Sequence, residues 1–306
     1  MQIAVVFPGQ GSQSVGMMNG FADAPVVART FEEASGILGE DLWALASAGP
    51  AEALSRTVVT QPLMLTAGVA CWRAWRERGG PMPAVFAGHS LGEYAALVAA
   101  GALRFEDALP LVRLRAQYMQ EAVPEGVGGI AAIVGLDDAM IAKVCEEAAQ
   151  GEVLEPANLN SPGQIVVAGH RAAVERGMAL ARAKGAKIAK MLPMSAPSHC
   201  SLMKPAAARL RERLAELAIA APSVPVVQNA DVACFDEPGR IRQALVEQLY
   251  RPVRWADTVR HLQARGVARI VECAPGKVLA GLVKRTVDGV EAVAVTDSAA
   301  LAAALA

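Results

Sequence analysis

The sequence lacks the patterns that would place the chain in a membrane, in an oxidising compartment or on nucleic acid. No apolar run is long enough to span a bilayer, and the start, Met1-Gln2-Ile3, has no charged signal-peptide head. The cysteines form neither a C-x-x-C pair nor a metal-ligand spacing, which is typical of reduced thiols in a cytoplasmic protein. The formal net charge is -1, so neither nucleic acid nor a membrane surface is an expected partner. The five cysteines are Cys71, Cys145, Cys200, Cys234 and Cys273.

Aromatic residues are also scarce, at 4% of the 306 residues, whereas 53% of the residues are hydrophobic. This length is enough for one large domain, or for a large domain with a smaller insert. The many alanines and few aromatic side chains favour an α/β enzyme core in which helices pack closely.

The stretch from residue 83 to 101 carries the clearest functional pattern. Residues 84–87 predict a buried strand, and the alanine-rich run 91–100 predicts a helix that ends at a glycine. Between them lies G-H-S-L-G, residues 88–92. In a tight strand-to-helix turn, the glycines leave room for the backbone, and Ser90 stands out near the helix N-terminus. Ser90 is therefore a candidate nucleophile; the alternative is a serine that caps the helix between two turn glycines.

A second glycine-punctuated loop follows the first apolar run of the chain. Residues 3–7 predict a short buried strand that leads into P-G-Q-G-S-Q, residues 8–13. Such a loop is a typical place for a binding site in an open α/β sheet. It is not a P-loop, because no G-K-[ST] follows. The alternative is an ordinary strand-ending turn.

One arginine falls on the apolar face of a predicted helix, residues 105–122. Arg115 lies four residues after Leu111 and four before Met119, both on that face. A buried guanidinium needs an anionic partner, because an unpaired buried charge is very costly. The partner is either a carboxylate of this protein or a carboxylate of the substrate, and both stay open at this point.

The alternation of helices and short apolar strands predicts an α/β fold: a hydrolase-like core with a mostly parallel sheet. Residues 126–193 differ, because their order is βαββαβ, the ferredoxin-like split unit. We therefore expect a catalytic core of residues 1–125 and 194–306 and a ferredoxin-like insert of residues 126–193. The insert is predicted from strands at 130–134, 153–157, 164–168 and 186–192, helices at 137–147 and 172–184, and a turn at 158–163.

Three further predictions concern the core. A helix is expected at residues 61–78, with Thr60 as its cap and Pro62 in its first turn. Residues 292–295 are expected to form an edge strand, and the alanine-rich run from 298 to 306 a final helix.

A serine nucleophile needs a base, and there are four histidines. His89 adjoins Ser90 and is expected to shape the pocket, His170 lies in the insert, and His261 lies on a helix, half exposed. By elimination His199 is the candidate base, in a loop that could face a cleft between two domains. No acid between the serine and the histidine lies in an obvious catalytic loop. Since a backbone carbonyl can also orient a histidine, no acid is assigned.

Several separated motifs resemble those of the malonyl-CoA:acyl carrier protein transacylase family, nearly end to end. They are F-P-G-Q-G-S-Q at 7–13, T-Q-P at 60–62, G-H-S-L-G-E at 88–93, R-A-Q-Y-M-Q at 115–120, N-L-N-S-P-G-Q at 158–164, P-S-H-C at 197–200 and Q-L-Y-R-P-V-R-W at 248–255. The resemblance implies that Ser90 carries the acyl group as an ester, with His199 as general base and then general acid. It also implies that the main-chain carbonyl of Gln248 orients His199.

The same resemblance implies an oxyanion hole made by the backbone amides of Gln10 and Leu91, and a bidentate pair between Arg115 and the malonyl carboxylate. The implied reaction transfers malonyl from malonyl-CoA to the phosphopantetheine thiol of acyl carrier protein, for fatty acid elongation. The family implies no bound cofactor and no metal. A cytoplasmic monomer that meets its carrier protein transiently is expected.

Three alternative functions compete with this one. A serine hydrolase or thioesterase predicts a carboxylate in the triad and no buried arginine. A separate acyltransferase for a polyketide synthase, or for a malonate-processing complex, would keep the same reaction in another pathway. A carrier-binding protein with a relic site is disfavoured because Ser90, His199 and Arg115 occur together.

Overall fold

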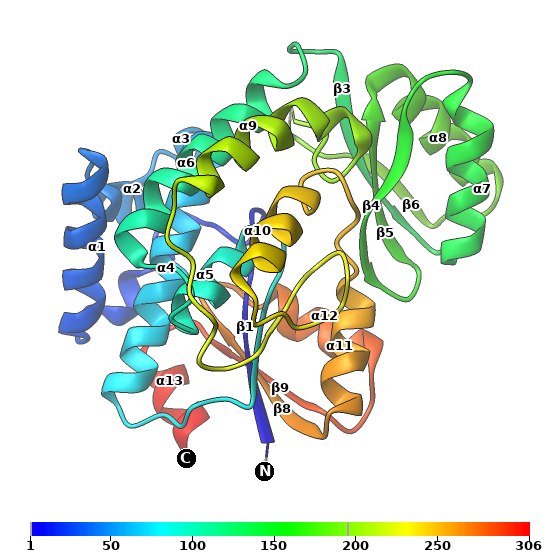
Figure 1. The fold of residues 1–306 in the computed structure, drawn as a ribbon. Helices are drawn as coiled ribbons and strands as arrows, with labels where there is room; N and C mark the ends of the chain where they lie inside the picture. The colour runs from blue at the N-terminus through cyan, green and yellow to red at the C-terminus, as the bar shows by residue number, and fades with distance from the viewer. Residues whose placement is uncertain (1, 195) are drawn as a thin grey trace.

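A five-stranded parallel sheet forms the centre of the molecule in the computed structural model, which describes residues 2–194 and 196–306 (Figure 1). The strand order is β7-β2-β1-β8-β9, and every neighbouring pair runs parallel. The strands are β1 (Gln2–Phe7), β2 (Val85–Gly88), β7 (Val226–Val227), β8 (Val267–Cys273) and β9 (Glu291–Val295). The predicted edge strand is thus confirmed as β9.

Helices cover both faces of this sheet because its central strands are apolar on both sides. In β1, Val5 and Phe7 point into the larger core, and Ala4 and Val6 into a smaller core on the opposite face. The larger core contains residues of α1 (Pro25–Leu38), α2 (Leu42–Ala48), α3 (Ala51–Ser55), α4 (Thr57–Glu77), α5 (Gly92–Ala99), α6 (Phe105–Glu121), α9 (Lys204–Ala215), α10 (Pro238–Glu247) and α13 (Ser298–Leu305). The smaller core contains residues of α11 (Trp255–Ala264) and α12 (Val278–Thr286).

Residues 128–191 form a second, antiparallel sheet of four strands in the order β4-β5-β3-β6. Two helices pack on the face of this sheet that points away from the central sheet (Figure 1). The other face packs against Cys200 and Leu202 of the core. The elements are β3 (Gly128–Val134), α7 (Asp138–Ala149), β4 (Leu154–Ser161), β5 (Gln164–His170), α8 (Arg171–Ala183) and β6 (Ile188–Met191). The βαββαβ order is confirmed, while the exact domain boundaries stay a prediction.

Two local predictions are wrong. Thr60 does not cap α4, and Pro62 does not lie in its first turn, because the helix begins at Thr57. Both residues lie inside the helix, and the Thr60 hydroxyl donates to the carbonyl of Arg56 at 3.0 Å. The predicted turn at 158–163 is mostly strand, since β4 continues to Ser161. Its backbone pairs with β5 and, at Asn158, with Val253 of the core.

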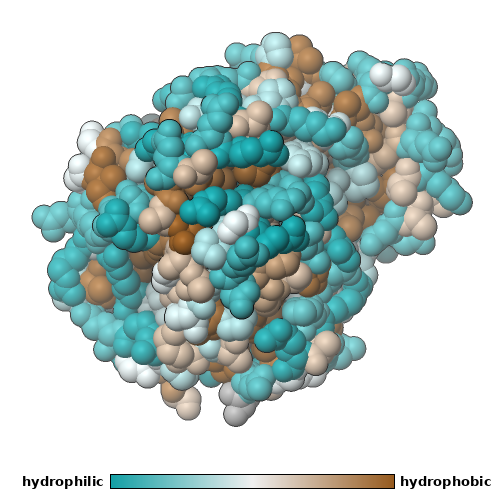
Figure 2. Space-filling view, viewed as in Figure 1, coloured by the Kyte–Doolittle hydropathy of each residue, from teal (hydrophilic) through white to brown (hydrophobic). Residues whose placement is uncertain are grey.

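The face of the molecule in Figure 2 is mainly hydrophilic, with hydrophobic residues showing in separate patches. Within residues 2–194 and 196–306, no helix combines the length and the apolar character needed to cross a membrane.

Candidate active site

Ser90 lies in a strand-to-helix turn between β2 and α5, as the sequence predicts. A Cβ atom on Gly88 would overlap the backbone of Gly92, and one on Gly92 would overlap the carbonyl of Phe7. Both glycines are therefore required for the turn to pack. Ser90 itself has a φ of 51°, a left-handed conformation that few non-glycine residues adopt. The turn exposes the Ser90 side chain to a cavity at the carboxyl ends of the parallel strands.

The structure brings His199 to Ser90, although 109 positions separate them in the chain: the His199 Nε2 atom lies 2.7 Å from the Ser90 Oγ. The His199 Nδ1 atom lies 2.7 Å from the backbone carbonyl oxygen of Gln248. A carbonyl only accepts, so Nδ1 carries the proton, and Nε2 is free to accept the serine proton. Burial, with the nearby charge of Arg115, lowers the pKa of His199 to about 3. The ring is therefore neutral at physiological pH.

Arg115 is 1% exposed and also points at Ser90. Its Nη1 donates to the Gln61 Oε1 at 2.7 Å, and its Nη2 donates to the Gln248 Oε1 at 2.9 Å and to the Ser90 Oγ at 3.3 Å. Among the residues that the structure describes, no carboxylate forms an ion pair with this guanidinium. Burial lowers the pKa of Arg115, while Tyr94, whose ring centroid lies 5.5 Å from the guanidinium carbon, and then Glu93 act against this through space. The hydrogen-bonded partners are thus neutral groups, which leaves the positive charge available to a bound anion.

The two predicted amide donors also border this cavity. Gln10 and Leu91 both line it together with Ser90. A Cβ atom on Gly9 would lie 3.7 Å from the Leu91 nitrogen, so the loop after β1 packs against the serine turn. Within the described part of the chain, neither the Gln10 nor the Leu91 backbone N–H has a hydrogen-bond partner. Unpaired backbone N–H groups beside a serine can bind a developing negative oxygen.

The cavity has a volume of about 400 Å³ and lies between the two sheets. The polar end contains Ser90, His199 and Arg115. Apolar side chains of the second sheet, Ile130 and Val166 among them, also line the cavity. The prediction of a site in a cleft between two units is in keeping with this placement. Across all described positions, no three His, Cys, Asp or Glu side chains are grouped as a metal site.

Strand β4 ties the second sheet to the site, which the sequence alone does not reveal. The Asn160 Oδ1 lies 2.8 Å from the His89 Nε2, and the His89 ring packs on Trp255 with 5.5 Å between ring centroids. Glu155 accepts hydrogen bonds from both the backbone N–H and the hydroxyl of Ser201, each at 2.7 Å. Ser201 follows His199 by two residues, so the second sheet holds the loop that carries the histidine.

The remaining histidines lie outside the cavity. The His170 Nδ1 accepts from the Val153 backbone N–H at 2.9 Å within the second sheet, and His261 lies on α11. The supporting amide of Gln61 was not predicted from the sequence. A signal for it exists in the T-Q-P motif at 60–62, since a glutamine buried in an apolar helix needs a polar partner.

Comparison with known proteins places this site in a known class. A model of the acyl transferase domain matches residues 4–303. The malonyl CoA-acyl carrier protein transacylase of Salmonella typhimurium is 58% identical over 305 residues, which cover 99% of each chain. The chain is thus an acyl transferase domain. The chain belongs, within that class, to the malonyl CoA-acyl carrier protein transacylase family.

Solved structures agree with this assignment. The acyl-carrier-protein S-malonyltransferase of Burkholderia pseudomallei is 55% identical, with a TM-score of 0.98, and the match covers 100% of this chain and 99% of the other. A malonyl-transacylase solved in complex with its type II PKS acyl-carrier protein is 52% identical, again with a TM-score of 0.98 and the same coverage.

Proposed function

We propose that the chain transfers a malonyl group from malonyl-CoA to the phosphopantetheine thiol of acyl carrier protein, through a malonyl ester on Ser90. The observation that carries the proposal is the meeting of three groups in one cavity: a serine, a neutral histidine and an arginine that has no carboxylate partner among the described residues. The chain is an acyltransferase of fatty acid synthesis, as the family to which it belongs indicates.

In the first half-reaction, the Ser90 Oγ attacks the thioester carbonyl of malonyl-CoA, and the His199 Nε2 takes the serine proton. The new oxyanion is held by the backbone N–H groups of Gln10 and Leu91, each worth about 3–4 kcal/mol. Collapse of the tetrahedral intermediate breaks the C–S bond. The CoA sulfur leaves with the proton from His199, and the malonyl group stays on the serine as an ester.

The second half-reaction runs the same steps with another thiol. The phosphopantetheine thiol of the carrier protein gives its proton to His199 and attacks the malonyl ester. The C–O bond to Ser90 breaks, and His199 returns the proton to the serine oxygen. One site thus serves both substrates in turn, which is a ping-pong reaction.

Arg115 gives the site its preference for an acyl group with a free carboxylate. The two Nη atoms that now contact the amide oxygens of Gln61 and Gln248 are placed to meet that carboxylate as a bidentate pair. An acetyl group offers no anion, and a buried site built for a charged group rejects a ligand that lacks it.

A serine hydrolase is disfavoured by the partner of His199. That partner is the Gln248 carbonyl, where a hydrolase of this fold is expected to have a carboxylate. A polyketide or malonate-processing pathway would use the same reaction, and the likeness to a malonyl-transacylase crystallised with a PKS carrier protein keeps it as the second candidate. Identification of the carrier protein encoded nearby would distinguish the pathways.

We further propose a division into a core of residues 1–125 and 194–306 and an insert of residues 126–193. The chain is expected to act as a monomer that binds its carrier protein transiently and needs no bound cofactor or metal. A cytoplasmic location is supported by five cysteines that all stay unpaired.

Replacement of His199 by alanine is expected to slow both half-reactions by about 10²- to 10⁴-fold, because both need the same proton acceptor. Rapid-quench measurement of ester formation, and then of transfer to carrier protein, checks this. His261→Ala is the matched control, since His261 lies on α11 outside the cavity. Normal turnover by His199→Ala would remove His199 from the role of base.

The pH dependence of ester formation gives a separate prediction. The lowered pKa of His199 means that the ring stays neutral, and able to accept a proton, well below pH 6.5. We therefore expect kcat/KM for ester formation to stay nearly constant between about pH 8 and pH 5. A decline centred near pH 6.5, in a chain that is still folded, would show a histidine with an ordinary pKa.

A further inference from the structure

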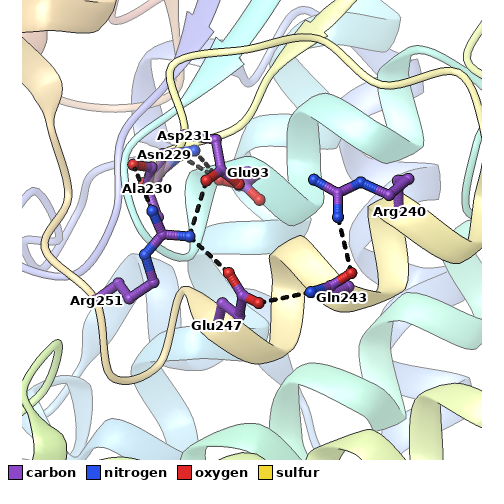
Figure 3. A network of polar contacts seen from close by, with 8 residues as sticks. All are labelled: Glu93, Asn229, Ala230, Asp231, Arg240, Gln243, Glu247 and Arg251. Atoms are coloured by element: carbon purple, nitrogen blue, oxygen red, sulfur yellow. Dashed lines mark hydrogen bonds and ion pairs between the residues drawn. The ribbon is translucent and has the colours of Figure 1, made fainter.

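A buried carboxylate, Glu93, lies behind the serine turn and takes no part in the steps above. Glu93 lies in the first turn of α5 and is 0% exposed. Its Oε2 atom accepts a hydrogen bond from the Asn229 backbone N–H at 2.8 Å and another from the Asn229 side-chain amide (Figure 3). Burial of a carboxylate costs free energy unless hydrogen bonds compensate it. A carboxylate that is fully buried with two such bonds is therefore expected to have a structural or functional role.

Asn229 joins this carboxylate to two backbone groups of the serine turn. The Asn229 Oδ1 accepts the Ser90 backbone N–H at 2.7 Å, and its Nδ2 donates to the Gly88 carbonyl oxygen at 2.6 Å. The Ser90 carbonyl oxygen is held separately, by the Gln248 Nε2 at 3.0 Å. The backbone of Ser90 is therefore fixed at both of its polar atoms.

The side-chain amide of Asn229 satisfies these partners in one orientation only. Rotated by half a turn, it would set its NH₂ group against the Ser90 N–H, and its oxygen against the Gly88 carbonyl and Glu93. Glu93 adds a second acceptor on the NH₂ side and so selects the orientation that Ser90 needs. This matters because Ser90 has a left-handed backbone, which persists only where its surroundings impose it.

The loop that carries Asn229 is tied to the segment that orients His199. The Arg251 Nη1 donates to Asp231 at 2.8 Å and to Glu247 at 2.6 Å (Figure 3). Glu247 directly precedes Gln248, whose carbonyl meets the His199 ring. The backbone N–H of Arg254 also donates to the Asn229 carbonyl, at 3.1 Å. The serine side and the histidine side thus share one polar network.

We propose that Glu93 and Asn229 are positioning residues for Ser90: Glu93 fixes the Asn229 amide, and this amide holds the Ser90 backbone so that its Oγ stays within reach of His199. The inference rests on the nucleophilic role proposed for Ser90. Glu93 acts as a hydrogen-bond acceptor and not through its charge. A neutral carboxyl group or a carboxamide at position 93 also offers a carbonyl oxygen, so the role does not depend on ionisation. Burial raises the pKa of Glu93 to about 7.

The test compares Glu93→Ala, Glu93→Gln, Asn229→Ala and the double variant Glu93→Ala/Asn229→Ala with the wild-type chain. The readout is the rate of malonyl ester formation at saturating malonyl-CoA, by rapid quench and intact mass, with the KM for malonyl-CoA measured in parallel. We expect Glu93→Ala and Asn229→Ala to be slower by about 100-fold with little change in KM, because a misplaced nucleophile loses rate and not binding. The double variant should be no slower than Asn229→Ala, and Glu93→Gln should restore most of the rate.

Each opposite result overturns the inference. Wild-type rates in both alanine variants, additive losses in the double variant, or a Glu93→Gln variant as slow as Glu93→Ala would each exclude action of Glu93 through the Asn229 amide. Asp297→Ala is the control, since it removes a carboxylate that caps α13 and does not line the cavity.

Two controls separate a positioning role from a loss of folding. Thermal unfolding is recorded for every variant, to show that each one is folded. Should an alanine variant not fold, the isosteric Asn229→Asp carries the test: it sets a carboxylate oxygen against the Gly88 carbonyl and Glu93, and an unchanged rate would refute the inference. A wild-type chain that forms no ester refutes the proposed function instead, so the two failures are distinguishable.

Discussion

Replacement of Ser90 by alanine is expected to abolish the malonyl ester and to lower malonyl transfer by roughly four orders of magnitude or more. The reason is the geometry of the turn: within the described residues, Ser90 is the hydroxyl that His199 contacts, at 2.7 Å. Without it, the thiol of the carrier protein would have to attack bound malonyl-CoA directly, in a cavity that is arranged around one attacking oxygen. Intact mass spectrometry after incubation with malonyl-CoA checks the ester, and a carrier-protein assay checks transfer.

Ser223→Ala is a suitable control for this result. The Ser223 hydroxyl donates to the Ala100 carbonyl at 2.8 Å and does not line the cavity. A full ester signal in Ser90→Ala would show that another residue carries the acyl group, and the assignment of the nucleophile would be wrong.

Replacement of Arg115 by alanine is expected to remove the preference for malonyl over acetyl groups. Loss of one partner from a buried charge pair costs about 2–5 kcal/mol, which lowers kcat/KM for malonyl-CoA by roughly 30- to 4,000-fold. Acetyl-CoA loses no ion pair in the variant, and it no longer leaves a buried guanidinium unpaired. Its kcat/KM should therefore stay constant or rise, so that the ratio of the two values falls towards one.

Arg113→Ala is the matched control on the same helix. Arg113 pairs with Glu40 at 3.0 Å and donates to the Leu38 carbonyl, away from the cavity. An unchanged malonyl-to-acetyl ratio in Arg115→Ala would exclude the guanidinium from acyl selection. Arg115→Lys adds a finer comparison, because a lysine keeps the charge but cannot form the bidentate pair.

Patterns that depend on neighbouring residues were predictable from the sequence. The turn around Ser90 follows from two glycines between an apolar run and an alanine-rich run, and β2 and α5 lie within one residue of the predicted bounds. The burial of Arg115 follows from its spacing to Leu111 and Met119 on one helix face. In both cases the signal lies within a few positions of the residue concerned.

Features that depend on distant partners were not predictable in this way. Strand β4 extends to Ser161 because its backbone meets β5 and Val253, and no local pattern records the second partner. The Gln248 group that lies against the His199 Nδ1 is a backbone carbonyl, which does not depend on side-chain identity, so a search for a catalytic acid could not find it. Asn229 lies 139 positions from Ser90, in a loop whose own residues carry no sign of that contact.

The first residue of α4 shows a third reason why local patterns do not predict every detail of the fold. The pair Thr60-Pro62 is a typical beginning of a helix, yet α4 starts at Thr57. Pro62 is the sixth residue of the helix and lies beyond its first turn, where a proline has no N–H to donate to the carbonyl of Val58. The Thr60 hydroxyl bonds back to the preceding turn. Local capping signals thus gave the right helix but not its first turn.

Intact mass spectrometry of the wild-type chain, first with malonyl-CoA alone and then with phosphopantetheinylated carrier protein, tests the central claim most directly. We predict a gain of one malonyl group that maps to the peptide containing Ser90, and then its complete transfer to the carrier protein with recovery of the unmodified chain. A chain that never gains the group, or that releases free malonate before the carrier protein is added, would contradict the account.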